Sequence, residues 1–337
     1  MSHAKRTGHT RWQVPLPPGI TRLQAAHGSV FGSGSSGAVH AWSTVDGSLR
    51  FSRGEQGTIC EGFAVVNDSL LVVLAKRKHA EVFQKTAFSF DANTGLEHGR
   101  TELSLDGPVG GTSVAHTHTH LFLSLQKSAE LLGLDDQAQE VVLLALEPGV
   151  AVANLLGAGD MVVAMVTPHQ GLRGYLADET LALSLDNAMP LAWSDSGLLA
   201  MVNGEVRCLD ERGVERWRRP FDVSSRMVLT PELVIAVDHL GMVHALDTKS
   251  GETKWSTSSS AKKSALLNPV VCDGHAWVLN ALGQVVAFDL TDGRKAFAPN
   301  DHYPQSRGLI ASEHSVFIHR EVAGHDTLTA LEFAQTR

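Results

Sequence analysis

A short segment that recurs along the chain constrains the fold more than any other feature. GMVHALDTKSGETKWS at 241–256 aligns without a gap with GAVHAWSTVDGSLRFS at 37–52 and with GQVVAFDLTDGRKAFA at 283–298. In each copy an alternating strand pattern leads to Asp or Ser, a glycine follows four residues later, and a large aromatic comes after it. Internal repetition of this kind is the sequence signature of repeat architectures.

Each copy has the chemistry of a β-hairpin. A side-chain oxygen at the start of the turn accepts from backbone N–H groups, and glycine supplies the positive φ that closes it. An apolar strand pair precedes each copy, as in NPVVCDGHAWVLNALG, so each unit is predicted to hold four antiparallel strands. Further copies lie at 86–100, 129–141, 204–219 and in TLTALEF near the C-terminus.

The spacing of the copies sets the number of units. The anchor residues are Ser43, Asp91, Asp135, Asp210, Asp247, Asp289 and Glu332. One interval, between Asp135 and Asp210, has double length, and the missing unit is predicted in DMVVAMVTPHQGLRGYLADETLALSL, with Asp178 near its turn. The mean step of about 41 residues is typical of four-stranded propeller blades. The prediction is an all-β, eight-bladed β-propeller, with seven blades, one of them oversized, as the alternative.

The last copy lacks its fourth strand before the chain stops at Arg337, and the N-terminal HTRWQVPLP resembles ERWRRPF and TKWSTS. We therefore expect residues 9–16 to complete the last blade, with Trp12 in the place of Trp217 and Trp255, which removes an open sheet edge. The prediction is one domain over 9–337 with a disordered tail at 1–8. The predicted blades are 20–57, 58–106, 107–145, 146–187, 188–222, 223–260, 261–300, and 301–337 with 9–16.

The pattern ALD-x-x-x-G-x-x-x-W resembles the PQQ-like, or quinoprotein-type, β-propeller repeat over nearly the whole chain. One branch of that family holds secreted quinoprotein dehydrogenases with pyrroloquinoline quinone and calcium. Another holds non-catalytic propellers, such as the lipoprotein of the outer-membrane β-barrel assembly machinery. The resemblance implies the fold, but one fold hosts many functions.

The features that the dehydrogenase branch implies are not found in this sequence. There are no adjacent cysteines, no long insertions between blades and no export signal. The six tryptophans mostly fall at repeat positions, where packing between blades is the favoured interpretation over a cofactor platform; they are Trp12, Trp42, Trp193, Trp217, Trp255 and Trp277. We predict no enzyme, no catalytic, cofactor-binding or metal residues, and no cofactor.

Charge and cysteine content limit the partners and the compartment. The net charge of −8 argues against a nucleic-acid partner, which needs a basic surface. The most apolar region is interrupted by Glu147, Pro148 and Asp160, so membrane insertion is not expected. The three widely spaced cysteines, Cys60, Cys208 and Cys272, fit a reducing compartment, and the predicted localisation is cytoplasmic.

Three histidines, His116, His118 and His120, stand at alternate positions in VAHTHTHLFL and raise the question of a metal site. The repeat register places His118 on Asp273 of PVVCDGHAWVL, in a tight turn, so the histidines straddle that turn. A hairpin can still bring His116 and His120 together. We favour solvated turn residues over metal ligands, because no carboxylate is expected nearby to orient the rings.

Loops that depart from the repeat are the best candidates for a binding face, because loops on a rigid scaffold carry binding. They are Ala75–Gln84, which contains the basic run KRKH at 76–79, and Pro168–Arg173. The run GSGSSG at 32–37 lacks the lysine of a P-loop and is read as a turn within the first blade. The predicted function is a non-catalytic protein-interaction scaffold. The alternative is a small-molecule-binding propeller or a divergent quinoprotein-type enzyme that uses the central channel.

Overall fold

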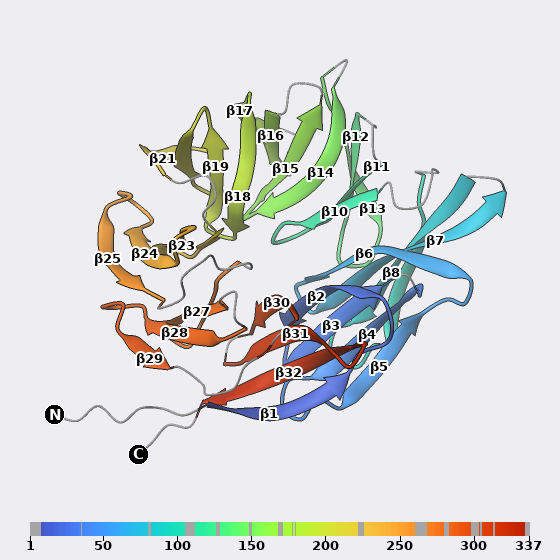
Figure 1. Ribbon diagram of the computed structural model, residues 1–337. Coiled ribbons are helices and arrows are strands. Elements are labelled where there is room, and N and C mark those ends of the chain that lie inside the picture. The colour runs from blue at the N-terminus through green and yellow to red at the C-terminus, as the bar shows by residue number, and fades with distance from the viewer. Residues whose placement is uncertain are drawn as a thin grey trace. The chain divides into compact units, whose positions relative to one another are not determined.

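The structure is a computed structural model. It describes residues 8–34, 36–79, 82–104, 112–125, 129–147, 150–167, 171–176, 178, 180–221, 226–259, 268–279, 283–297, 303, 305–312 and 314–333. The regular elements there are β-strands, and the strands form four-stranded antiparallel sheets (Figure 1). None of the described residues forms a helix with the length and apolar character needed to cross a membrane.

The first four sheets follow the predicted blades in order. The first is β2 (Ile20–Ala26), β3 (Ser29–Gly34), β4 (Ala38–Ser43) and β5 (Leu49–Gly54). The second is β6 (Thr58–Val66), β7 (Ser69–His79), β8 (Val82–Asp91) and β9 (Glu97–Glu102). The third is β10 (Thr112–His116), β11 (Leu121–Leu125), β12 (Glu130–Leu134) and β13 (Glu140–Ala145). The fourth is β14 (Ala151–Ala158), β15 (Met161–Thr167), β16 (Gly171–Leu176) and β17 (Leu181–Leu185).

The remaining sheets complete the set. The fifth is β18 (Ala188–Ser194), β19 (Gly197–Val202), β20 (Glu205–Leu209) and β21 (Glu215–Pro220). The sixth is β22 (Arg226–Leu229), β23 (Leu233–Val237), β24 (Met242–Asp247) and β25 (Thr253–Ser258). The seventh is β26 (Val270–Cys272), β27 (His275–Leu279), β28 (Val285–Asp289) and β29 (Lys295–Phe297). The eighth is β30 (Ser306–Ala311), β31 (Val316–Val322), β32 (His325–Phe333) and β1 (Gly8–Pro15). The predicted eight-bladed β-propeller is confirmed.

The N-terminal strand completes the last blade, as predicted. β1 pairs antiparallel with β32 (Figure 1). In this pairing Trp12 lies opposite Ala330. The strand begins at Gly8, one residue inside the segment predicted as a tail, and residues 1–7 lie outside the described part.

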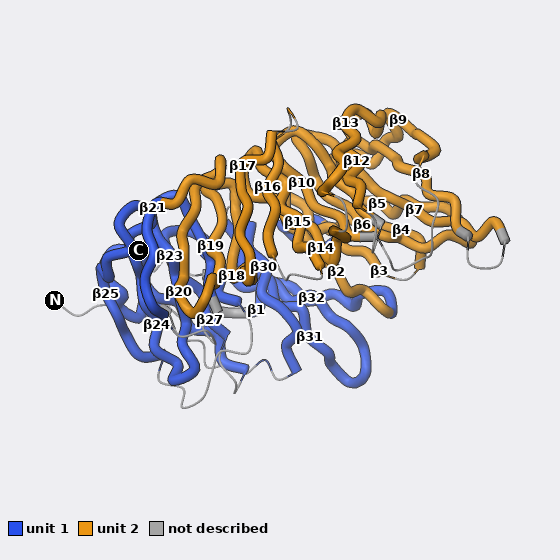
Figure 2. The backbone as a smooth tube through the Cα atoms, turned by 90° about the horizontal axis from the view of Figure 1, so that it is seen from above, with its two compact units in different colours: residues 1–18, 43–48, 216–337 blue, residues 19–42, 49–215 orange. Residues whose placement is uncertain are grey.

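The chain divides into two compact units (Figure 2). One contains residues 1–18, 43–48 and 216–337, and the other contains 19–42 and 49–215. Within each unit, buried apolar side chains of successive blades form shared clusters. Phe31 and Phe51 of the first blade, for example, pack with Leu70, Phe88 and Phe90 of the second. The single domain predicted over 9–337 stays a prediction.

A bulge recurs between the third and fourth strands of the blades. In the sixth blade it follows the pair Ala245 and Trp255, and in the first it follows Ala41 and Phe51. The third-strand partner at this point is small in every blade whose pairing is described; these partners are Ala41, Ser89, Gly133, Gly174, Ala245, Ala287 and Ala330. Except in the second blade, where Gly99 lies opposite Ser89, this leaves room for a larger side chain opposite. The bulge therefore defines an equivalent position on each of these outer strands.

Candidate functional site

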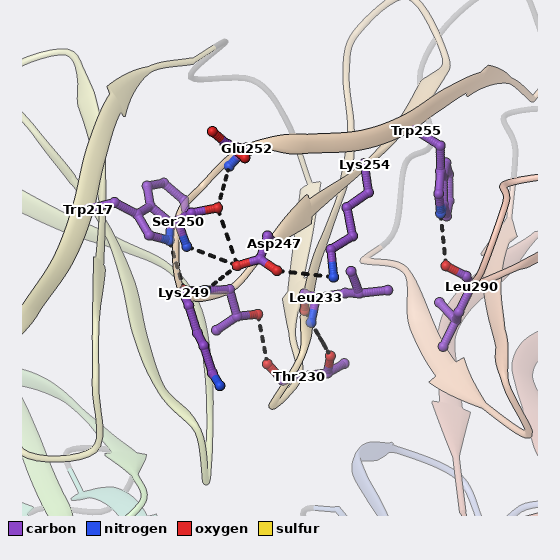
Figure 3. Close-up of polar contacts among 11 residues, drawn as sticks. Trp217, Thr230, Leu233, Asp247, Lys249, Ser250, Glu252, Lys254, Trp255 and Leu290 are labelled. Carbon is purple, nitrogen blue, oxygen red and sulfur yellow. Dashed lines mark hydrogen bonds and ion pairs between the residues drawn. The ribbon is translucent and has the colours of Figure 1, made fainter.

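The Asp–Gly turn of the repeat is a hydrogen-bonded structural unit. Oδ1 of Asp247 accepts from the backbone N–H groups of Lys249 and Ser250, each at 2.9 Å, and Oδ2 lies 3.0 Å from Nζ of Lys254 (Figure 3). The hydrogen bond with Lys254, followed by those from the backbone, lowers the pKa of Asp247 to about 2. The carboxylates of Asp91, Asp135, Asp210 and Asp289 accept from their own turns in the same way. These acids hold the turns of the repeat.

The aromatic of the repeat packs on the turn of the next blade. Nε1 of Trp217 donates to the carbonyl of Thr248 at 2.8 Å, and Nε1 of Trp255 donates to that of Leu290 at 2.8 Å (Figure 3). A methyl group added at Gly251 or Gly293 would stand within 2.7 Å of the corresponding indole ring. The glycine of the turn therefore serves two purposes, since it takes a positive φ and makes room for the ring.

Packing accounts for five of the six tryptophans. Trp12 repeats the arrangement by donating to the carbonyl of Thr44 at 3.2 Å beside Gly47. Trp42 and Trp277 are buried, and Trp277 packs in a cluster that includes Val316 and Ile318 of the next blade. Trp193 is the exception: it lies on β18 with 46% of its surface exposed, so the predicted packing role is wrong at this residue.

The three histidines occupy the positions that the register predicted. His116 ends β10, His118 lies in the turn, and His120 precedes β11. The N–H of Thr117 donates to the carbonyl of His120 at 2.9 Å, which closes the hairpin. Burial lowers the pKa of His116, which favours its neutral form. Within the described residues no group of three or more His, Cys, Asp or Glu side chains has a metal-binding arrangement.

The expectation that no carboxylate lies near these histidines is wrong. Nδ1 of His118 lies 2.9 Å from a carboxylate oxygen of Asp160, and Nε2 lies 3.5 Å from one of Asp195. The hydrogen bond with Asp160 is the main cause that raises the pKa of His118. The two acids lie in the turns between the first two strands of the fourth and fifth blades, far from His118 in sequence, so only the fold brings them together.

Similar pairs link the equivalent turns of other blades. His27 lies 3.6 Å from Asp68, and His314 lies 2.9 Å from Asp273. Each of these side chains is at least 32% exposed, so the pairs link neighbouring turns at the surface.

The predicted binding loops are described only in part. In Ala75–Gln84, β7 and β8 continue their pairing to His79 and Val82, with Lys76, Arg77 and Lys78 exposed, and residues 80 and 81 lie outside the described part. Of Pro168–Arg173, residues 168–170 lie outside it, and Arg173 is buried and pairs with Asp186 at 2.9 Å. The first three residues of GSGSSG end β3 and its last two precede β4 in the first blade, and residue 35 lies outside the described part.

Two features were not foreseen from the sequence. Lys85 and Glu61 form an ion pair at 3.6 Å inside the second blade, with 1% of each side chain exposed. Val141 and Leu143 on β13 are 48% and 56% exposed, although they belong to an apolar run that reads as core. Neither feature had a signal in the sequence, because VVLLAL at 141–146 is a continuous apolar run and nothing near Lys85 in the chain points to Glu61.

Comparison with known proteins supports the fold from two directions. Residues 202–332 match the family model described as outer membrane protein assembly factor BamB. No curated protein matches the chain. Among solved structures, BamB from Moraxella catarrhalis is 15% identical with a TM-score of 0.65, and the alignment covers 98% of this chain and 99% of that one. The computationally designed Ika8 protein is 14% identical with a TM-score of 0.67, covering 94% and 97%. At these identities the solved structures show the fold alone.

Proposed function

We propose that this chain, a PQQ-like β-propeller that resembles BamB, is a non-catalytic protein-interaction scaffold. The family model that matches residues 202–332 is described as an assembly factor, and this description supports a role in binding proteins. The solved BamB structure covers nearly the whole chain, but its identity of 15% is too low to transfer a partner.

The observation that carries the proposal is where the chain departs from its own repeat. The repeated acids and most tryptophans are engaged in turns and packing. The departures are exposed: Trp193 at 46%, Leu143 at 56%, and the basic end of the β7–β8 hairpin. Exposed aromatic and aliphatic side chains of this kind are what protein interfaces use as anchors.

We also propose that the protein works in the cytoplasm and binds neither nucleic acid nor the membrane interior. Cys60, Cys208 and Cys272 form no disulfide with one another, and burial raises the pKa of Cys272 to about 11. Cysteines kept as thiols are typical of a reducing compartment. The net charge of −8 works against binding to phosphate backbones. Fractionation of the source cells, with thiol labelling of the recovered protein, tests the compartment.

The test of the function is native purification from the source cells, with the stoichiometry of co-eluting proteins measured by mass spectrometry. A stoichiometric protein partner is the expected result. A partner-free protein that carries a bound small molecule, or that turns one over, would replace the scaffold by the alternative of a ligand-binding or enzymatic propeller. An absorbance spectrum of the purified protein tests for bound quinone in the same sample.

A further inference from the structure

β13 is the outer strand of the third blade. The strand order of that sheet is β10-β11-β12-β13, and within the described part of the chain no strand pairs with the far side of β13. A strand in this position presents backbone N–H and C=O groups that another strand can pair with.

The backbone groups that face outward can be identified from the ladder. The N–H of Leu146 donates to the carbonyl of Ala129 at 2.7 Å, at the end of the β12–β13 pairing. Hydrogen-bonded and non-hydrogen-bonded pairs alternate along an antiparallel ladder. Leu144 therefore directs its backbone groups to β12, while Leu143 and Ala145 direct theirs away from the sheet.

The exposed side chains of β13 are apolar. Val141 and Leu143 are 48% and 56% exposed and Ala145 is exposed, whereas Leu144 between them is buried. The bulge after Gly133 and Val142 aligns β13 with the other outer strands. At the position of Leu143 the other described outer strands carry polar residues: Gln13, Ser52, Arg100, Ser184, Arg218 and Ser256. At the position of Val141, most of the other described outer strands carry a basic residue: Arg11, Arg50, His98, Arg216 and Lys254.

This difference has no explanation in the packing of the blade. Leu144 and Val142 supply the inward side chains, and Leu143 gives little to the core because more than half of it is in solvent. Charged side chains on an outer strand protect the edge against pairing with other chains. β13 lacks this protection and has alternating apolar side chains, which is the pattern of a strand that is paired on its outer edge.

The charges around the strand indicate what it pairs with. Glu140 lies at the start of β13, Glu147 follows its end, and Glu130 lies opposite Ala145 on β12. A second copy paired antiparallel about Leu143 would place Glu140 of one chain beside Glu147 of the other, and the net charge of −8 adds to this repulsion. Glu140 accepts from Ser104 and Glu147 lies 3.9 Å from Arg173, but both carboxylates are exposed, so a strand with basic ends meets negative charge at both ends.

We propose that β13 binds an extended segment of a protein partner as an added strand. The segment carries apolar side chains at alternate positions, to cover Val141, Leu143 and Ala145, and Lys or Arg at its ends. The backbone pairing gives affinity and the apolar and charged positions give selectivity. This inference rests on the proposed scaffold function and names the binding edge and the partner's chemistry.

The experiment selects binders from a random twelve-residue peptide library displayed on phage, using the purified full chain. A synthetic copy of an enriched peptide is then measured by fluorescence anisotropy against wild type, Leu143→Lys, Val141→Lys and Leu49→Lys. Leu49 begins outer strand β5 and is 56% exposed, the same as Leu143, so Leu49→Lys is a matched control. Amide hydrogen exchange of β13 is followed with and without the peptide.

The expected peptides alternate apolar residues and have basic ends, and they slow exchange at Leu143 and Ala145. Leu143→Lys and Val141→Lys each weaken binding by about tenfold or more, as for an interface anchor, while Leu49→Lys binds as wild type. The inference is overturned if no peptide is enriched, if the peptides have acidic ends, or if Leu49→Lys weakens binding equally. Sedimentation that shows a wild-type dimer and a monomeric Leu143→Lys would also overturn it, in favour of a second copy.

The same variants separate this inference from the proposed function. If the native partner co-purifies with Leu143→Lys as well as with wild type, β13 is not the binding edge and the scaffold function stands. If wild type has no protein partner, the scaffold function itself fails.

Discussion

At the scale of single residues, two glycines with the same backbone angle separate conformation from packing. Gly293 and Gly274 both have φ of +71°, but an added methyl at Gly293 would meet the ring of Trp255, whereas nothing lies within 4 Å of one at Gly274. We expect Gly274→Ala to destabilise by about 1–2 kcal/mol, the usual cost of a left-handed residue. We expect Gly293→Ala to lower the free energy of unfolding by about 1–3 kcal/mol more than Gly274→Ala, because the added methyl overpacks the site. Urea denaturation of both variants measures the difference, and equal losses would contradict the packing role.

The indole rings allow a second comparison at this scale. Trp255 is 9% exposed and donates to the carbonyl of Leu290, while Trp193 is 46% exposed. We expect Trp255→Ala to lower the free energy of unfolding by about 3–5 kcal/mol and Trp193→Ala to change it by about 0.5 kcal/mol or less. Urea midpoints at unchanged slope give both values. A large loss at Trp193 would mean that its ring packs in the fold after all.

The link between His118 and Asp160 predicts a pH dependence. The hydrogen bond with Asp160 raises the pKa of His118 above its ordinary 6.5. Since the folded pKa is the higher one, the stabilisation is complete below the unfolded pKa and is lost as the pH rises through the folded pKa. NMR titration of the imidazole should give a pKa above 6.5 in wild type and a lower one in Asp160→Asn. Asp68→Asn, which alters the acid beside His27, should leave the titration of His118 unchanged.

At the scale of elements, the second blade is expected to depend on its buried ion pair. Lys85 on β8 and Glu61 on β6 each have 1% of the side chain exposed. Lys85→Met leaves the carboxylate buried without its cation, so we expect a loss of about 3–5 kcal/mol, and the double variant Lys85→Met with Glu61→Leu should recover most of it. Urea denaturation of the single and double variants decides this. A double variant as unstable as the single one would show that the pair itself, and not the uncompensated charge, matters.

The elements also show what a sequence of this kind can and cannot predict. Strand number, blade limits and the role of residues 9–16 were predictable because the repeat fixes turn chemistry at regular intervals. In the fourth blade Asp178 lies in the turn, but the hydrogen bond that closes the turn is donated by the backbone N–H of Leu176. The repeat pattern in the sequence was therefore weak in this blade. The partners of His118 and the exposed side of β13 depend on how blades meet and where they end, which a local repeat does not record.

At the scale of the whole molecule, the chain's first strand closes its last blade. β1 pairs with β32 over Gly8–Pro15, and Nε1 of Trp12 donates to the carbonyl of Thr44 beside Gly47. Removal of residues 1–16 exposes the edge of β32 and takes away the ring that covers the turn at Gly47. We expect the truncated protein to unfold at lower urea concentration and to aggregate, because an open apolar strand edge is a template for association.

A peptide added in trans distinguishes this closure from a general effect of shortening the chain. A synthetic peptide of residues 8–16 should bind the truncated protein and raise its urea midpoint in proportion to the logarithm of its concentration, once the concentration exceeds the dissociation constant. The same peptide with Trp12→Ala pairs its backbone but cannot fill the space at Gly47, so its rescue should be weaker. If both peptides rescue equally, backbone pairing alone closes the blade. If neither does, the loss of stability lies elsewhere in the deleted segment and β1 is not what closes the fold.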